Sequence, residues 1–366
     1  GVVRTRVAVN RGVQLCVFFC KDTATTGIYT LPLHDALPIY WTADPDPDSQ
    51  PTRTTPGDHP MSRPIAVAPD TRPVMYEAMC RAVSAAGATL VEPREAEGLI
   101  WADPGRTGEF PGIVADAERL SWIQLPYAGI EPFAHHLDDR WTWTCGKGVY
   151  APAVAETVLS LILALGKNLH GYARMRSWSG PEGRILAGSR ITILGGGGIT
   201  SHLLPLLAPW GCDVTVVRRS NTPLPGANRT ITSARLHEVL PMTDVLVLAL
   251  ALTAETTGIV GRPEFDALPD HAMLVNVARG AHVVTDELVD ALQGGRIAAA
   301  ALDVTEPEPL PDGHPLWSLP NCLITPHIGN TPEMGIRLLE PFVADNVRRF
   351  CEGRELLAGV DVALGY

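Results

Sequence analysis

The chain has 366 residues, 46% hydrophobic and 19% charged, a composition typical of a soluble globular protein with room for two domains. Its formal net charge of −11 is spread along the sequence, and no apolar run reaches the roughly 18 to 20 residues that span a bilayer, so we expect neither nucleic acid nor membrane as a partner. Seven cysteines without a C-x-x-C pair or metal-ligand spacing predict reduced thiols, a cytoplasmic location and no metal site.

Residues 1–60 are interpreted separately from the rest of the chain. They end in a stretch rich in Pro, Asp and Thr, and Met61 then opens a regular apolar pattern. Residues 22–39 resemble the in-frame translation of a sequencing-library adapter, with departures at Gly27 and Pro32, so we expect a non-native extension. Two alternatives stay open: a genuine disordered extension, and a signal peptide, because VQLCVFFC is a short apolar run near basic residues.

From Met61 onward, short apolar strands alternate with amphipathic helices, which predicts an α/β protein whose parallel sheets are covered on both faces. The first group of expected elements comprises strands at 65–69, 88–93, 98–103 and 120–126 and a helix at 76–87. A longer helix is expected at 151–175, before a surface connection rich in Gly, Pro and Ser. The second group comprises strands at 190–195, 212–219, 244–251, 271–278, 300–304 and 322–327 and a helix at 199–211, in which Pro205 and Pro209 predict a kink or an earlier end.

A run of four glycines follows the first strand of the second group. The stretch ILGGGGIT has the spacing G-x-G-x-x-T, with Thr200 where a dinucleotide fingerprint has its third glycine. Because the run lies between an apolar strand and a helix start, it predicts a pyrophosphate site: Gly195 permits the tight turn, and Gly197 lets the backbone approach the phosphates. The residues of this turn expected to contact the cofactor are Gly195, Gly197, Gly198 and Ile199.

The next strand of this group ends with Arg218, Arg219 and Ser220. Folds that bind NAD usually carry an acidic residue there, roughly 20 positions after the glycines, which bonds the ribose hydroxyls. Two guanidinium groups instead suit a ribose 2′-phosphate. We therefore expect these three residues to bind the cofactor and NADP(H) to be preferred, with NAD(H) possible; the alternative is a pair of solvated surface arginines.

Four blocks in order, LGGGGIT, LVNVARGAHVVTDELVDAL, AALDVTEPEPLPDGHPLW and LPNCLITPHIGNT, resemble the D-isomer specific 2-hydroxyacid dehydrogenases. The resemblance covers the chain from Met61 to Tyr366. It implies two Rossmann-like or flavodoxin-like domains with parallel sheets, the nucleotide-binding domain being inserted into the substrate domain, and an active site in the cleft between them. The implied substrate domain comprises 61–150 and 331–366, and the nucleotide domain comprises 151–330. We also expect a homodimer.

The resemblance assigns the substrate arginine to Arg279, the acid partner to Glu308 and the acid/base histidine to His327. An arginine fork can hold both the carboxylate and the carbonyl of a 2-keto acid, and a histidine can protonate the developing alkoxide. Glu308 would orient the imidazole and favour its protonated form. The implied reaction is hydride transfer between a nicotinamide cofactor and C2 of a small 2-keto or 2-hydroxy acid of D configuration, with glyoxylate- and hydroxypyruvate-like acids as expected substrates.

Further contacts are implied with less specific motifs. Asp303 would face the nicotinamide amide. Two positions depart from the family pattern: Gly198 replaces an arginine and Ala251 replaces a proline, and both departures are expected to affect the affinity for the cofactor. Lys147 is either a carboxylate contact or a solvated lysine. The other residues assigned to the cofactor are Thr253, Thr256 and Val277, and those assigned to the substrate are Ala128, Gly129, Lys147 and Tyr150.

Three other functions stay open at this level. A dehydrogenase of the same fold could oxidise another small anion, such as phosphite or formate. A nucleotide-sensing corepressor scaffold would use the same site for regulation. A methyltransferase also follows a strand with a glycine turn, but it would leave the arginine, glutamate and histidine unexplained.

Overall fold

The computed structural model describes residues 63–362, so the interpretation of residues 1–60 lies outside the described range. Contacts within the chain define a unit His59–Tyr366, to which all described residues belong. Two β-sheets form the framework of this unit, and every pair of neighbouring strands in both is parallel. The α/β class and the parallel sheets expected from the sequence are confirmed.

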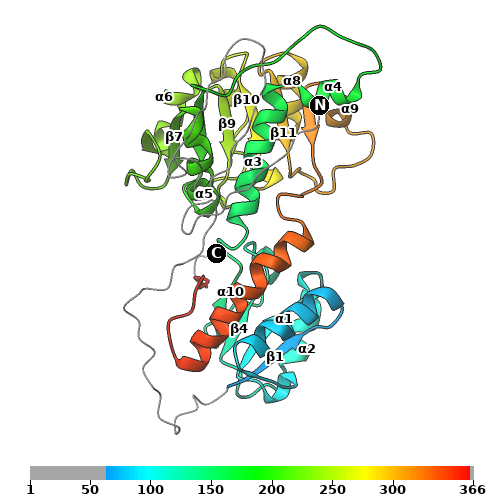
Figure 1. Ribbon diagram of the computed structural model, residues 1–366, viewed down its shortest axis with the longest axis vertical. Helices are drawn as coiled ribbons and strands as arrows, with labels where there is room; N and C mark the ends of the chain where they lie inside the picture. The colour runs from blue at the N-terminus through cyan, green and yellow to red at the C-terminus, as the bar shows by residue number, and fades with distance from the viewer. Residues whose placement is uncertain (1–62, 363–366) are drawn as a thin grey trace, which may run out of the picture. The chain divides into compact units, whose positions relative to one another are not determined.

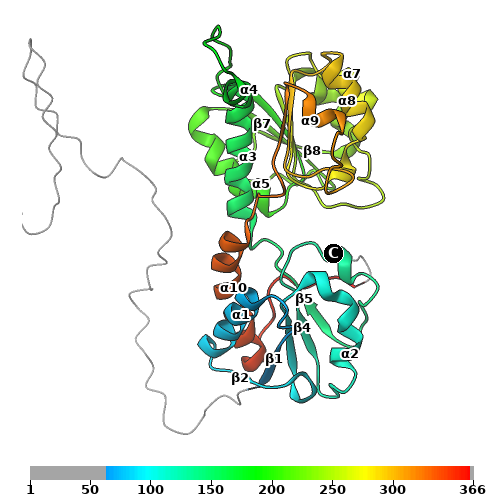
Figure 2. The same ribbon diagram turned by 90° about the vertical axis from the view of Figure 1, so that its right-hand side faces the viewer.

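The first sheet has the strand order β2-β1-β3-β4-β5, which is the flavodoxin-like order. Its strands are β1 (Pro64–Ala68), β2 (Thr89–Leu90), β3 (Gly98–Trp101), β4 (Trp122–Gln124) and β5 (Thr142–Thr144). Helices α1 (Pro73–Ala85) and α10 (Pro332–Glu352) lie side by side on one face, and α2 (Phe110–Val114) lies on the other (Figure 1, Figure 2). The last helix of the chain therefore returns to pack with the first.

The second sheet has the order β12-β11-β10-β9-β6-β7-β8, in which strand order reverses beside β6 as in a Rossmann fold. Its strands are β6 (Arg190–Leu194), β7 (Asp213–Arg218), β8 (Arg229–Thr232), β9 (Val245–Leu248), β10 (Met273–Asn276), β11 (Ala299–Leu302) and β12 (Cys322–Ile324). The helices of this part are α3 (Ala151–Gly166), α4 (Leu169–Arg174), α5 (Gly198–Leu207), α6 (Leu236–Val239), α7 (Arg262–Ala267), α8 (Thr285–Gln293) and α9 (Pro315–Ser318).

Helices cover both faces of this second sheet (Figure 2). Side chains of α3 and α5 join one apolar cluster, and side chains of α7, α8 and α9 join another. Successive residues of a strand point to opposite faces, so in β9 Val245 and Val247 belong to the first cluster whereas Leu246 and Leu248 belong to the second. Burial on both faces explains why the strands of this sheet read as continuous apolar runs in the sequence.

Some expected element boundaries are wrong. The strand expected at 88–93 is only two residues long, because Pro93 opens a short 3₁₀ turn and lacks the N–H that a ladder needs. The helix expected at 151–175 breaks at Asn168, whose φ of 51° is left-handed, and α3 and α4 lie on either side of the break. Strands β5 and β8 and the helices after α5 were not predicted.

The helix after the glycines also ends earlier than expected. It keeps Pro205 in its interior but stops at Leu207, and Pro209 lies in a following 3₁₀ turn. Of the kink and the earlier end expected from the two prolines, the structure therefore shows the earlier end. At the level of strands, β1–β5 come from the part of the chain before residue 150 and β6–β12 from 151–330. The domain boundaries themselves stay a prediction.

Candidate active site

The glycine turn lies where strand order reverses in the second sheet. Gly195 has φ 109°, and a Cβ built on it would overlap the Ala249 carbonyl at the end of β9, so only glycine fits. Its N–H donates to the Val217 carbonyl at 2.8 Å. Thr200 is fully buried, and its hydroxyl donates to the Gly195 carbonyl at 2.7 Å. In place of a third glycine, the threonine therefore ties the start of α5 to the turn.

The start of α5 fits the pyrophosphate of a dinucleotide. Gly197 caps this ten-residue helix, and a Cβ built on it has no atom within 4 Å, so a ligand can approach the backbone. Gly198 is exposed, although a Cβ built on it would lie 3.1 Å from the Ala151 Cβ, and Ile199 is partly buried against the apolar cluster of α3. Cofactor contacts by these two residues stay predictions. An arginine at position 198 would press on the first residue of α3.

Arg218 lies next to the glycine turn. It is half-buried at the end of β7, and a Cβ built on Gly196 would be 2.9 Å from its Cδ and 3.2 Å from its Nε. Arg219 and Ser220 are exposed, and the Ser220 hydroxyl donates to the Thr222 hydroxyl at 3.3 Å. Of the three residues expected at the ribose, Arg218 is therefore the one whose side chain lies against the glycine turn.

Residues 250–256, the cofactor-lining loop, contain the two threonines assigned to the cofactor. The Thr253 N–H donates to the Thr256 hydroxyl at 2.8 Å, and that hydroxyl donates to the Ala251 carbonyl at 2.8 Å. These bonds hold the loop in a tight turn although position 251 has no proline. Val277 lies just after β10, is buried and joins the α3 cluster, so most of its side chain is core.

The structure brings Glu308 and His327 together. The Glu308 Oε1 lies 2.7 Å from the His327 Nδ1, and the two side chains are 42% and 53% exposed, so the pair faces solvent while Nε2 points away from the bond. His327 has φ 53°, a left-handed conformation that is uncommon for a residue with a Cβ. Such strained backbone persists only where the surroundings hold it in place, as they often do in functional sites.

Asp303 supplies that support. Its carboxylate is 3% exposed and accepts hydrogen bonds from the Thr325 hydroxyl, the Ile328 N–H at 2.9 Å and the Gly329 N–H at 2.8 Å. The Asp303 carbonyl also accepts from the His327 N–H at 2.9 Å. Both carboxylate oxygens are therefore engaged by residues 325–329, the histidine loop. A contact between Asp303 and the nicotinamide amide stays a prediction.

The loop that carries Arg279 packs against the loop that carries Glu308. The Asn276 side chain donates to the Arg279 carbonyl at 2.9 Å and accepts from the Ala278 N–H at 3.0 Å, which sets the course of the backbone. The guanidinium donates to the Ala278 carbonyl at 2.8 Å. A Cβ built on Gly280 would overlap the backbone of Thr305 and Glu306.

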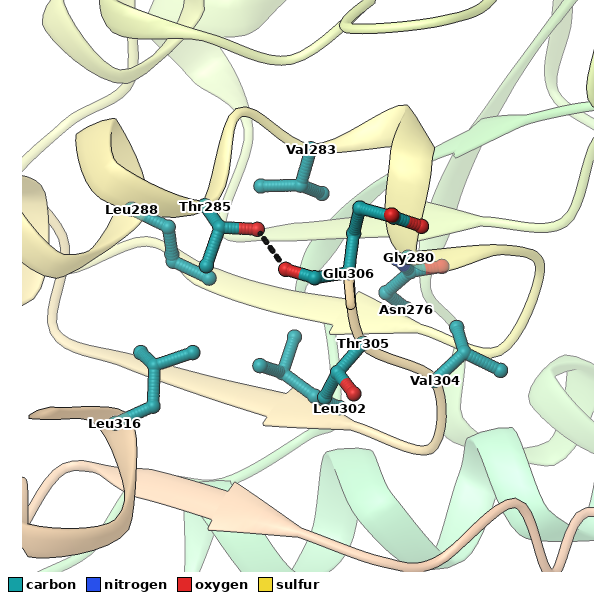
Figure 3. Close-up of a pocket in the computed structure, with 10 residues that line it drawn as sticks. All are labelled: Asn276, Gly280, Val283, Thr285, Leu288, Leu302, Val304, Thr305, Glu306 and Leu316. Atoms are coloured by element: carbon teal, nitrogen blue, oxygen red, sulfur yellow. Dashed lines mark hydrogen bonds between the residues drawn. The ribbon is translucent and has the colours of Figure 1, made fainter. Parts of the chain in front are cut away.

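Figure 3 shows this junction, where Asn276, Gly280, Thr305 and Glu306 lie close together and line one small pocket. The Thr285 hydroxyl donates to the Glu306 carbonyl at 2.8 Å, which fastens the second loop to the start of α8. Asn276 and Gly280 were not among the predicted site residues, although both lie in the NVARG motif that identified Arg279.

We expect Gly280→Ala to lower both stability and turnover. The added methyl must displace the Thr305–Glu306 backbone, and overpacking of this kind costs about 1–3 kcal/mol. Because Glu308 follows two residues later, its carboxylate should shift from His327. The thermal midpoint and kcat measure the two effects. Gly112→Ala is the matched control, since a Cβ at Gly112 meets nothing within 4 Å. If the two variants had the same thermal midpoint and the same kcat, the backbone of Thr305 and Glu306 would have made room for the methyl group at no cost, and the prediction would be wrong.

The residues expected to contact the substrate carboxylate lie on two braced segments of the first sheet. Ala128 is exposed and Gly129 is partly exposed in the turn after β4, and Lys147 is exposed after β5. The Tyr150 hydroxyl donates to the Pro126 carbonyl, and burial raises the pKa of Tyr150. The Tyr150 hydroxyl thus supports the turn after β4, and substrate contact by Ala128, Gly129, Lys147 and Tyr150 stays a prediction.

Two kinds of feature are absent from the part of the chain that the structure describes. Among residues 63–362, no group of three or more His, Cys, Asp or Glu side chains could hold a metal ion. No helix in the same range is long and apolar enough to cross a membrane.

The Rossmann strand order, the glycine turn at the strand reversal and the paired acid and histidine together define an NAD(P)-dependent dehydrogenase. A family model described as D-isomer specific 2-hydroxyacid dehydrogenase, NAD binding domain, matches residues 159–329. The chain belongs to the D-isomer specific 2-hydroxyacid dehydrogenase family.

Two curated proteins are similar to this chain over different lengths. An uncharacterised protein from the proB 3′ region of Corynebacterium melassecola is 36% identical over 303 residues, which are 80% of this chain and 98% of that protein. Glyoxylate/hydroxypyruvate reductase A of Enterobacter sp. (strain 638) is 36% identical over 176 residues, 48% of this chain and 56% of the reductase. The chain thus spans about half the length of that reductase.

A solved structure extends the similarity beyond the nucleotide domain. The crystal structure of a D-isomer specific 2-hydroxyacid dehydrogenase from Xanthobacter autotrophicus Py2, in complex with NADPH and MES, has a TM-score of 0.72 and 27% identity. It covers 83% of this chain and 100% of the Xanthobacter chain.

Proposed function

We propose that this protein is a reductase of small 2-keto acids that prefers NADPH and forms the D-2-hydroxy acid, with glyoxylate- and hydroxypyruvate-like substrates. The observation that carries the proposal is the 2.7 Å contact between Glu308 and the Nδ1 of His327, on a histidine loop held by a buried carboxylate. The reductase name of the Enterobacter relative supports the substrate class.

The chain's own residues suit the steps of such a reduction. Arg279 would hold the substrate carboxylate and polarise the carbonyl, because its fork presents two parallel donors. Glu308 would accept a hydrogen bond from the Nδ1–H of His327 and keep the ring in one orientation. His327 would then donate the proton on Nε2 to the substrate oxygen as negative charge develops there, and would take it back in the reverse direction.

The cofactor supplies the hydride when it is bound. Gly195 and Gly197 and the N-terminus of α5 would hold the pyrophosphate, Arg218 and Arg219 would meet the ribose phosphate, and Thr253 and Thr256 would line the cofactor. This assignment uses the conformation of Gly195 and the open space at Gly197.

A spectrophotometric panel tests the proposal. The full chain would be assayed with NADPH or NADH against glyoxylate, hydroxypyruvate, pyruvate and bulkier 2-keto acids. Phosphite and formate would be assayed in the oxidative direction, with NADP⁺ or NAD⁺. We expect the small keto acids to cause a loss of the NADPH absorbance. Turnover of phosphite or formate alone would instead identify a dehydrogenase for another anion, and cofactor binding without any turnover would favour a nucleotide-sensing scaffold.

We expect Arg218→Asp combined with Arg219→Ala to shift preference from NADPH to NADH by about tenfold or more. Each guanidinium–phosphate contact contributes about 1.5–3 kcal/mol, reduced at exposed sites, and 1.4 kcal/mol is a factor of ten. The shift should fall mainly on the KM for NADPH and weaken with added salt. Arg229→Ala, an exposed arginine of the neighbouring β8, is the control. A wild-type chain that uses NADH equally well at low salt would place the two arginines outside cofactor recognition.

The homodimer and the cytoplasmic location expected from the sequence stay predictions.

A further inference from the structure

His282 is a buried histidine that none of the roles above uses. It ends the 3₁₀ turn Gly280–His282, directly after Arg279, and its side chain is 0% exposed. Its Nδ1 lies 3.1 Å from the Thr256 carbonyl and its Nε2 lies 3.1 Å from the Leu250 carbonyl. These two carbonyls belong to the last and first residues of the cofactor-lining loop. One ring therefore spans the base of that loop.

Backbone bonds also secure the neighbouring segment. The Gly258 N–H donates to the Ala281 carbonyl at 2.8 Å, the Val260 N–H donates to the His282 carbonyl at 3.0 Å, and the Ile259 N–H donates to the Thr256 carbonyl at 3.3 Å. Within the loop, the bonds of Thr253 and Thr256 described above are local. The His282 ring lies beside both ends of the loop and belongs to the turn that follows the substrate arginine.

This arrangement adds to the threonine bonds that hold the loop in a tight turn. Ala251 stands where the family pattern has a proline, and a proline would fix φ whereas alanine leaves it free. A neutral imidazole has a single N–H, so the buried ring donates to one of the two carbonyls while its other nitrogen lies beside the second, and the ring adds a restraint at the base of the loop. In the low dielectric of the interior, such a hydrogen bond is electrostatically stronger than in water.

We propose that His282 is a positioning residue: its ring closes the cofactor-lining loop and fixes it against the turn that carries Arg279. One side chain then sets the places of the threonines that line the cofactor and of the arginine that holds the substrate. The proposal rests on the proposed function, because that function assigns the loop and Arg279 to cofactor and substrate.

Three variants identify which carbonyl accepts the ring N–H. An asparagine amide nitrogen can take the place of the histidine Nδ1 and a glutamine amide nitrogen that of Nε2, so His282→Asn can donate to the Thr256 carbonyl and His282→Gln to the Leu250 carbonyl. His282→Leu can donate to neither. Direct titration of NADPH by fluorescence gives the Kd without turnover, and keto-acid kinetics at saturating NADPH give KM and kcat.

We expect His282→Leu to raise the Kd for NADPH and the KM for the keto acid by about 3- to 10-fold each, the scale of one net hydrogen bond. The amide variant that restores the donated bond should recover part of the loss, and kcat should change by less than about threefold because His327 and Glu308 stay in place.

A structural role alone predicts a different result. His170→Leu is the matched control, because His170 is also buried but lies in α4. Both leucine variants should lower the thermal midpoint, and only His282→Leu should change Kd and KM. If Kd and KM of His282→Leu stay at wild-type values well below its unfolding midpoint, the proposal is wrong. If His282→Leu does not fold, unchanged constants in both amide variants overturn it equally.

The same titration distinguishes this proposal from the proposed function. A wild-type chain that binds NADPH but reduces no keto acid contradicts the proposed function, while the Kd values of the variants still decide the role of His282 in the loop. A wild-type chain that binds neither NADPH nor NADH overturns both.

The pH dependence of stability gives a second readout. Burial lowers the pKa of His282 from its ordinary value of 6.5, the Leu250 and Thr256 carbonyls oppose this, and the charge of Arg279 adds to it. Because the folded pKa lies below the unfolded one, the contribution of His282 is complete above about pH 6.5 and is lost as the pH falls toward the folded pKa.

His282→Asn carries no such group, so we expect its destabilisation relative to wild type to be smaller at pH 5.5 than at pH 7.5, as measured by urea unfolding. The partly buried His136 and the buried His170 titrate in both proteins and cancel from the difference. A destabilisation of the same size at both pH values would contradict the lowered pKa of His282 and therefore the buried position of its ring.

Discussion

Replacing His327 with asparagine is expected to lower kcat by about 10²–10⁴-fold, the usual contribution of a positioned general acid or base. Asparagine tolerates the left-handed conformation that residue 327 adopts, and its amide nitrogen can still bond Glu308, so the loop should keep its shape. It has no proton that it can give to an alkoxide near neutral pH. The Kd for NADPH should change by less than about twofold. Stopped-flow single-turnover rates measure the chemical step directly.

The control for this variant is another histidine–glutamate pair. In His237 and Glu264, Nε2 and Oε1 lie 3.0 Å apart on the surface, outside the candidate site. His237→Asn removes a similar pair and should leave kcat unchanged. Glu308→Gln should fall between wild type and His327→Asn, because glutamine can still contact the ring but cannot stabilise its charge. A His327→Asn variant with the wild-type rate across the pH range would exclude His327 from proton transfer.

Arg279→Lys is expected to lower kcat/KM for the keto acid by roughly 10- to 150-fold, which corresponds to about 1.5–3 kcal/mol. Lysine keeps the charge but is a point donor, so it cannot hold a carboxylate and a carbonyl with two parallel bonds. Steady-state kinetics at saturating NADPH separate this effect from cofactor binding. The Asn276 bond to the backbone at residue 279 is unaffected, so the thermal midpoint should change little.

Arg262→Lys serves as the comparison, because Arg262 pairs with Asp290 at 2.8 Å on α7 and α8, away from the glycine turn and the histidine loop. It should keep wild-type kcat/KM. If Arg279→Lys lost NADPH binding but kept the substrate kinetics of the wild type, Arg279 would contact the cofactor and not the substrate.

Much of the site could be predicted because its motifs are local. The strand–glycine–helix order that surrounds Gly195 needs only neighbouring residues, and the structure gives Gly195 the positive φ and the close backbone contact that only glycine allows. Arg218 at the end of β7 and Arg219 after it were selected in the same way, by their distance from the glycines, and their contact with the cofactor stays a prediction. Boundaries were less predictable: the break at Asn168 depends on a left-handed residue that periodicity does not reveal.

The sequence by itself determined the α/β class, the glycine turn and the residue types of the reacting groups, because strand and helix periods and short motifs are written in consecutive residues. Only the tertiary structure decided what holds those groups. The resemblance alone suggested a cofactor contact for Asp303, whereas its buried carboxylate binds a loop more than twenty residues away along the chain. His282 and Gly280 looked like parts of the Arg279 motif, and their partners lie on other loops. Contacts of this kind join residues far apart in the sequence, so they arise only when the strands are placed side by side.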